Sequence, residues 1–102
     1  MKQSEVTLVR VYCSEAGHQH QKIIDMLHHD HRVTGVTAFR GIAGFGKSGH
    51  IHEAGLLDVS LDLPVIIEFF DRPDKVAAVL PLLNEMVGPG HIVSWPATAN
   101  LE

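Results

Sequence analysis

The residues best suited to chemistry form one glycine-rich stretch in the middle of the chain. Residues 41–48 read Gly-Ile-Ala-Gly-Phe-Gly-Lys-Ser and satisfy the P-loop pattern G-x-x-x-x-G-K-[ST], whose amides and lysine hold phosphates. A working P-loop also needs a helix that begins at the Lys-Ser step, whereas residues 49–52 favour extended chain. We therefore expect a weaker anion cradle of unshielded amides and one cation, and the alternative is a plain flexible loop.

A second glycine turn, Gly88-Pro89-Gly90, stands directly before His91. Its glycines permit positive φ and leave backbone amides accessible, although a plain helix C-cap explains the same residues. The turn is a candidate for ligand binding because, in an oligomer, it could reach the same cleft as the first glycine stretch. The candidate ligand-binding residues are Arg40, Gly41, Gly44, Phe45, Gly46, Lys47, Ser48, Gly88, Gly90 and His91.

The chain holds eight histidines, which raises the question of a metal site. His50 and His52 would point to one side of an extended segment and form a candidate pair of ligands. Two ligands are not a site, and neither a second cysteine nor an obvious third ligand accompanies them. We therefore expect solvated or hydrogen-bonded histidines and no metal, with His50 and His52 kept as the alternative.

No set of residues predicts catalysis by a side-chain nucleophile. The single cysteine, Cys13, has no sequence neighbour that would activate it, and no nucleophile-elbow sequence surrounds Ser48 or Ser60. We expect a protein that is not an enzyme, with weak nucleotide hydrolysis as the alternative. Arg40 and Glu68 interrupt two apolar strands that should be neighbours, so we predict that they pair, with ligand contact as the alternative.

Length and composition bound the kind of protein. The 102 residues suit one domain, and 45% hydrophobic with 20% charged residues is typical of a globular chain rather than a disordered or membrane protein. The net charge of -4 and the scattered lysines and arginines argue against a nucleic-acid partner. One cysteine, and an opening without a charged-then-apolar signal, favour the cytoplasm.

Hydrophobic periodicity predicts six elements in β-α-β-β-α-β order, with strands at 5–12, 36–43, 65–70 and 91–95 and helices at 17–30 and from Asp71 to the glycines at 88–90. Asp71 is expected to cap the second helix, and Pro81 to bend or divide it. This order is the ferredoxin-like α+β pattern, a sandwich of four antiparallel strands with two helices on one face. Because the first and third strands are apolar on both sides, we expect another subunit to bury the uncovered face.

The same residues resemble a known family. The block Arg40-Gly-Ile-Ala-Gly-Phe-Gly-Lys-Ser-Gly-His-Ile-His52, followed by Leu61-Asp-Leu-Pro-Val-Ile-Ile-Glu68, looks like the signature of a small, largely uncharacterised family of PII-like proteins. The resemblance implies a homotrimer whose residues 44–62 correspond to the T-loop of PII signalling proteins. It also implies an adenine nucleotide in the cleft between subunits, held by the T-loop base and the turn at 88–91. The effector would then control docking onto a partner such as a membrane transporter or an enzyme.

Two departures from PII proteins bear on the effector. His91 stands where they usually carry a lysine, and residues 96–100 hold none of the basic residues expected after the last strand. Fewer cations favour AMP or ADP over ATP. The alternative function is a metal-binding trimer that resembles the divalent-ion tolerance proteins of the same fold, with His50 and His52 as ligands.

Overall fold

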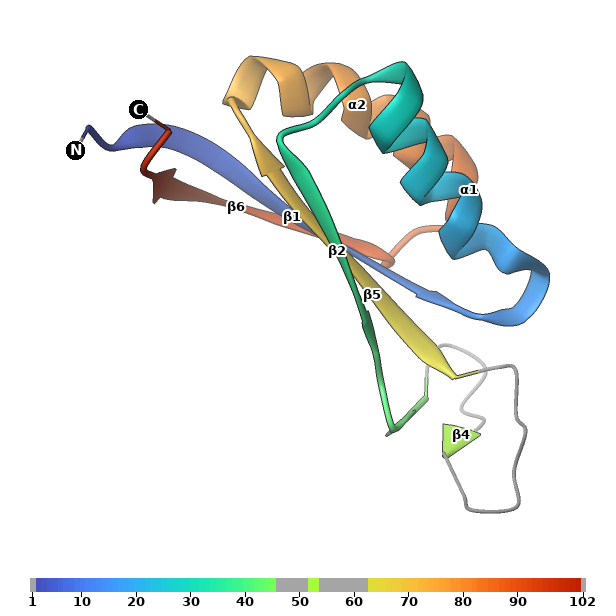
Figure 1. Ribbon diagram of the computed structural model, residues 1–102. Coiled ribbons are helices and arrows are strands. Elements are labelled where there is room, and N and C mark those ends of the chain that lie inside the picture. The colour runs from blue at the N-terminus through green and yellow to red at the C-terminus, as the bar shows by residue number, and fades with distance from the viewer. Residues whose placement is uncertain (1, 46–51, 54–62, 102) are drawn as a thin grey trace.

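The computed structural model describes residues 2–45, 52–53 and 63–101 and contains one four-stranded antiparallel sheet covered by helices on one face (Figure 1). The strands are β1 (Ser4–Ser14), β2 (Gly35–Arg40), β5 (Pro64–Asp71) and β6 (Ile92–Ala99), in the order β2-β5-β1-β6. Two-residue strands β3 (Ala43–Gly44) and β4 (His52–Glu53) pair separately. The expected ferredoxin-like α+β fold is confirmed.

The first helical region has three parts: a 3-10 turn η1 (Ala16–His18), helix α1 (Gln19–Asp25) and a π-helical turn η2 (Met26–Asp30). The second is helix α2 (Pro73–Met86), which begins with a proline at its first position, where no amide partner is needed. The predicted division of the helix at Pro81 is wrong, because α2 continues through this residue as one helix, whereas a bend there stays a prediction. Val79 and Leu83, on either side, are buried against the sheet and hold both halves in place.

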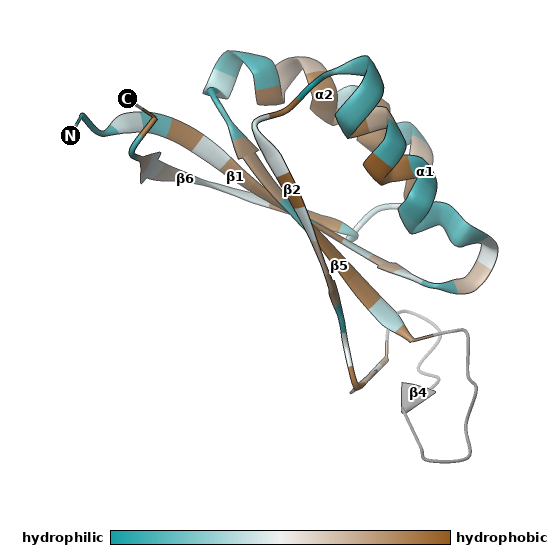
Figure 2. Cartoon of the chain, viewed as in Figure 1, coloured by the Kyte–Doolittle hydropathy of each residue, from teal (hydrophilic) through white to brown (hydrophobic). Residues whose placement is uncertain are grey.

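The core lies between the helices and one face of the sheet. In β5 every second residue is buried, and α1 and α2 cover them with apolar side chains three to four residues apart. The apolar strand centres are visible in Figure 2. The core side chains are Val9, Val11, Ile23, Leu27, Val65, Ile67, Phe69, Val76, Val79 and Leu83. Each large side chain buried in this way contributes about 1.5–3 kcal/mol, which fixes the helices on this face.

The C-terminal ends of β2 and β6 differ most from the prediction, whereas the other strand boundaries lie within two residues of it. β6 continues through Pro96 to Ala99, although we expected it to end at Trp95. Pro96 lies opposite Thr7 on a strand at the edge of the sheet, and an edge strand tolerates a proline because half of its amides face away from the ladder. β2 ends at Arg40 instead of residue 43, because the backbone then turns into the short strand β3.

Asp71 does not cap α2, contrary to the prediction. It ends β5, and its carboxylate accepts hydrogen bonds from the amides of Thr34 (2.9 Å) and Arg72 (2.8 Å) and from the Thr34 hydroxyl (3.2 Å). Burial alone would raise the pKa of Asp71, but these bonds and the nearby Lys75 ammonium outweigh burial and lower it. The carboxylate therefore joins the turn before β2 to the start of α2.

The variant Asp71→Asn should lose about 1–3 kcal/mol of unfolding free energy at pH 7, because buried amides would lose a charged acceptor. A lowered folded-state pKa means that Asp71 stabilises the fold above its unfolded pKa, about 3.9, and that this contribution is lost as pH falls below it. Denaturant unfolding at pH 7 and pH 3 should thus show a gap between wild type and variant that narrows in acid. The exposed Asp25→Asn is the control, and a gap independent of pH would contradict the assignment.

The sheet face opposite the helices carries large apolar side chains in contact with water. Tyr12, Phe39, Val93 and Trp95 are all between 38% and 47% exposed. At the centre of this face Arg10 Nε lies 2.8 Å from Glu68 Oε1, and the guanidinium stacks 6.0 Å from the Trp95 ring. An apolar surface around one ion pair is typical of an interface.

Candidate functional site

Both glycine turns lie at the same end of the sheet. The Gly41 amide donates to the Pro64 carbonyl at 2.7 Å, where β5 begins, and the Tyr12 amide donates to the His91 carbonyl at 2.7 Å, near the end of β1. Their strands, β2 and β6, are the two edges of the sheet. Three strand spacings, or about 14 Å, therefore separate them within one chain.

The first turn is built by close contact with Pro64. A Cβ on Gly41 would lie 2.7 Å from Pro64 Cγ, and one on Gly44 would lie 3.2 Å from it. A side chain at position 41 therefore cannot fit without moving the proline ring. Gly41, which we assigned to ligand binding, thus has a packing role that by itself accounts for a glycine, whereas at Gly44 a small shift of the proline would make room for a side chain.

Substitution of Gly41 by alanine should lower the free energy of unfolding by about 1–3 kcal/mol, because the added methyl overpacks against Pro64. Gly35→Ala is the matched control, since a Cβ there meets nothing within 4 Å. It should be neutral or stabilising by up to about 1 kcal/mol. Thermal denaturation of both variants measures the difference, and equal melting temperatures would show that Pro64 yields.

The second turn combines one glycine with a positive φ, Gly90, and one without, Gly88. Gly90 has φ +84°, which favours glycine, whereas Gly88 has no positive φ and a Cβ there would make only an ordinary contact with His91. The His91 Nδ1 lies 2.9 Å from the Tyr12 carbonyl and therefore acts as the donor. In a neutral ring Nε2 is then an acceptor, so His91 donates to an anion through Nε2 only when protonated.

Arg40 does not pair with Glu68, and this prediction is wrong. Glu68 lies opposite Thr37 in the β2–β5 register, and its partner is Arg10. Arg40 lies opposite Val65 and forms an ion pair with Glu15, which follows β1. Arg40 is three residues after Thr37 on β2, and residues three apart on a strand point to opposite faces of the sheet. The side chains of Arg40 and Glu68 therefore cannot meet.

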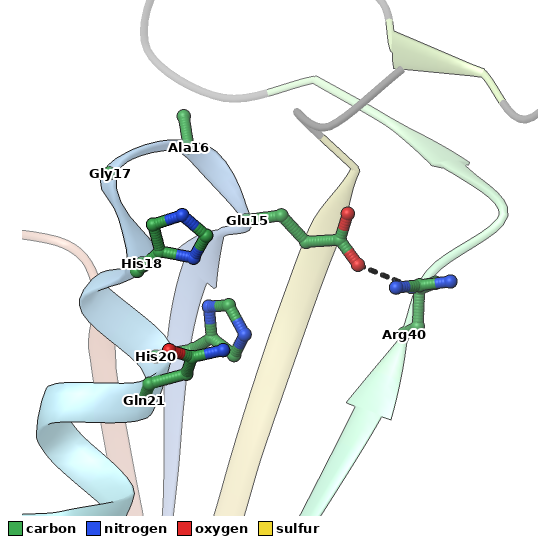
Figure 3. A pocket seen from close by; sticks show the side chains of 7 residues that line it. All are labelled: Glu15, Ala16, Gly17, His18, His20, Gln21 and Arg40. Carbon is green, nitrogen blue, oxygen red and sulfur yellow. Dashed lines mark ion pairs between the residues drawn. The ribbon is translucent and has the colours of Figure 1, made fainter. Parts of the chain in front are cut away.

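The Glu15–Arg40 pair borders a hollow of about 510 Å³ (Figure 3). Figure 3 shows Glu15 reaching across β5 toward Arg40, with His18, His20 and Gln21 beside it on the chain that enters α1. Sequence reasoning missed Glu15 and these three polar side chains as site residues. An acidic residue and two histidines just after the first strand were the available signal, but only the fold brings them to Arg40.

The remaining candidates are placed as follows. Phe45 is 74% exposed at the end of the first turn. Gly46, Lys47, Ser48 and His50 lie outside the described residues, and His52 is described only as a backbone partner of Gly44 in β4. Within the described part of the chain no group of three His, Cys, Asp or Glu side chains is placed to hold a metal ion. The alternative site at His50 and His52 stays a prediction.

Two further observations bear on chemistry. All three strand pairings of the main sheet are antiparallel, so the sheet lacks the parallel strands on which a P-loop normally sits. Burial raises the pKa of the Cys13 thiol, which keeps it protonated and weakly nucleophilic.

Of the helices that the structure describes, none has the length and apolarity to cross a bilayer.

The order of elements and the antiparallel sheet with helices on one face define an α+β protein of the ferredoxin-like fold class. Residues 6–99 match the DUF190 family, described as "Uncharacterized ACR, COG1993", and the chain belongs to it. A UPF0166 protein of Methanocaldococcus jannaschii is 38% identical over 55 residues, and one of Aquifex aeolicus is 38% identical over 48 residues. These matches cover 54% and 47% of this chain, and the chain spans about half the length of each relative (50% and 46%).

Solved structures with the same fold include PII-like proteins. CPII of Thiomonas intermedia K12, a nitrogen regulatory PII-like protein solved with ADP, AMP and bicarbonate, superposes with a TM-score of 0.71 at 18% identity, covering 96% of this chain and 91% of CPII. A putative PII-like signaling protein of Thermus thermophilus gives 0.67 at 14% identity, with 97% and 91% covered. The divalent ion tolerance protein CutA1 of Ehrlichia chaffeensis gives 0.61 at 10% identity, with 95% and 83% covered. At these identities the likeness shows the fold alone.

Proposed function

We propose that this chain is a PII-like regulatory protein of the cytoplasm that assembles as a homotrimer and binds an adenine nucleotide between its subunits. The observation that carries the proposal is the uncovered face of the sheet. Its four exposed side chains, Tyr12, Phe39, Val93 and Trp95, favour burial against copies of the same surface. Burial of this face in a closed assembly brings sheet edges of neighbouring subunits together.

Assembly would give the two glycine turns a shared ligand. They lie at one end of the sheet but on opposite edges, so the β2 edge of one subunit and the β6 edge of the next can form a single crevice. Arg40 of one chain and the amides of the second turn of the next would then face the same anion. The nucleotides bound to CPII, a protein of the same fold, support an adenine nucleotide as this ligand.

We propose AMP or ADP as the preferred effector. His91 directs Nδ1 to the Tyr12 carbonyl, so in its neutral form it gives a phosphate no donor through Nε2. Residues 96–100 add no lysine or arginine. The third phosphate of ATP would therefore bring negative charge that the described residues at this end of the sheet do not offset.

The bound nucleotide would act as a signal rather than a substrate. A ligand that favours one conformation of residues 44–62 shifts the population toward it, and the affinity for a protein partner changes by the same factor in return. A membrane transporter or an enzyme is the kind of partner that we propose. No side chain of the described site is an activated nucleophile, so we propose regulation without turnover.

Assembly is tested by Phe39→Glu, whose new carboxylate would lie opposite the apolar Ile66 on the uncovered face. This variant should convert the trimer to monomer in native mass spectrometry. A carboxylate buried at the interface without a partner costs several kcal/mol, so trimer dissociation should rise more than about tenfold. Leu82→Glu is the control, because Leu82 is 38% exposed on α2, away from the sheet face, and its variant should stay trimeric. A wild-type protein that remains monomeric at high concentration would refute the assembly.

Nucleotide binding is tested by calorimetric titration with AMP, ADP and ATP, and we expect ATP to bind weakest. Gly88→Val should weaken binding about tenfold by covering the amides of the second turn, while its φ allows the side chain without strain. Phosphate release in the same samples should stay at background. No heat with any of the three nucleotides would remove the nucleotide proposal.

A further inference from the structure

The Glu15–Arg40 ion pair spans the two ends of the connection between β2 and β5. The Glu15 amide donates to the Leu63 carbonyl at 3.0 Å, and the Gly41 amide, next to Arg40, donates to the carbonyl of Pro64 at 2.7 Å. Leu63 and Pro64 are consecutive residues at the point where the connection rejoins the sheet. The Glu15–Arg40 ion pair therefore lies beside Leu63 and Pro64, where the two ends of the connection between β2 and β5 come together.

The two partners of the pair differ in exposure. The Glu15 side chain is only 11% exposed, whereas that of Arg40 is 68% exposed. A guanidinium carries five donors in a planar fork, and a single carboxylate oxygen contacts Nε here. Arg40 is thus held from one side by a sheltered carboxylate and is open to solvent on the other.

The hollow beside the pair is rich in hydrogen-bonding side chains. His18, His20 and Gln21 line it together with the ion pair (Figure 3). His20 Nδ1 is buried and finds no hydrogen-bond partner among the described residues. A buried polar atom without a partner is rare in folded proteins, and beside a hollow it indicates a water or ligand that completes it.

Backbone strain occurs at the same place. Gly17 has φ +72° and His18 has φ +55°, and a left-handed conformation costs a non-glycine residue about 1–2 kcal/mol. Such strain clusters at functional sites, where the surrounding contacts hold it. The strain, the unpaired imidazole nitrogen and the exposed guanidinium all border one hollow.

We propose that this hollow is an oxyanion subsite in which Glu15 occupies the place of a ligand: a phosphate of the effector binds Arg40 and displaces the Glu15 carboxylate. The inference rests on the proposed nucleotide function and adds an internal competitor to it. Exchange of a fixed carboxylate for a soluble phosphate releases Glu15 from Arg40. The junction at Leu63 and Pro64 therefore differs between the empty and the occupied states.

The test is the effect of Glu15→Gln on ADP binding by the intact protein, measured by calorimetry. Removal of the competing charge should tighten binding about two- to fivefold, the range set by a partly exposed ion pair. Arg40→Gln should weaken binding about tenfold, and the double variant should bind as weakly as Arg40→Gln alone, because Glu15 acts only through Arg40. Glu5→Gln, the same change on an exposed residue at the far end of β1, should leave affinity unchanged.

A second variant and a second probe allow the inference to be tested even if Glu15→Gln does not fold or the wild type binds no nucleotide. Glu15→Asp retains the charge but shortens its reach, so it should also tighten binding, by less than Glu15→Gln, and it serves if the latter does not fold. Unchanged or weaker ADP binding in both variants would overturn the inference while the nucleotide site stands. If the wild type binds no nucleotide, inorganic pyrophosphate is the probe, and its failure to bind Glu15→Gln more tightly than wild type would overturn the inference independently.

Discussion

The structure depends on one imbalance in hydrophobic burial. Two helices cover a single face of the sheet, so the core buries Val9, Ile67 and Phe69. On the other face Tyr12 of the central strand β1 and Phe39 and Trp95 of the edge strands stay in contact with water. No further element among the described residues covers the second face (Figure 1). Association of subunits through that face, and the crevice that would follow from it, both originate in this imbalance.

The ion pair on the uncovered face has a different character from the one at the loop base. Arg10 and Glu68 lie among apolar neighbours, so assembly would desolvate both charges, and such pairs contribute register more than affinity. Glu15 and Arg40 lie at the rim, where one partner stays exposed and can change ligands. The Arg10–Glu68 pair is thus suited to specifying how subunits assemble. The Glu15–Arg40 pair is suited to exchanging its carboxylate for a ligand.

Close packing explains much of the glycine-rich block. Gly41 and Gly44 lie against Pro64, so a glycine at position 41 is favoured by the approach of β2 to the start of β5 even before any ligand is considered. A glycine pattern read only as a phosphate motif therefore overstates its chemistry. The Gly41 amide is itself part of this packing, because it donates to the Pro64 carbonyl and is therefore not available to an anion.

The sequence by itself determined the β-α-β-β-α-β order and the two-sided apolar strands, because each follows from local periodicity and side-chain type. It did not determine which face of these strands the helices cover, since both faces are apolar. Only the tertiary structure decided the partners of the charged residues: Glu15 for Arg40, Arg10 for Glu68 and Thr34 for Asp71. The physical reason is strand register. A shift of one residue moves a side chain to the other face of the sheet, and hydrophobic periodicity does not specify which distant residue lies opposite.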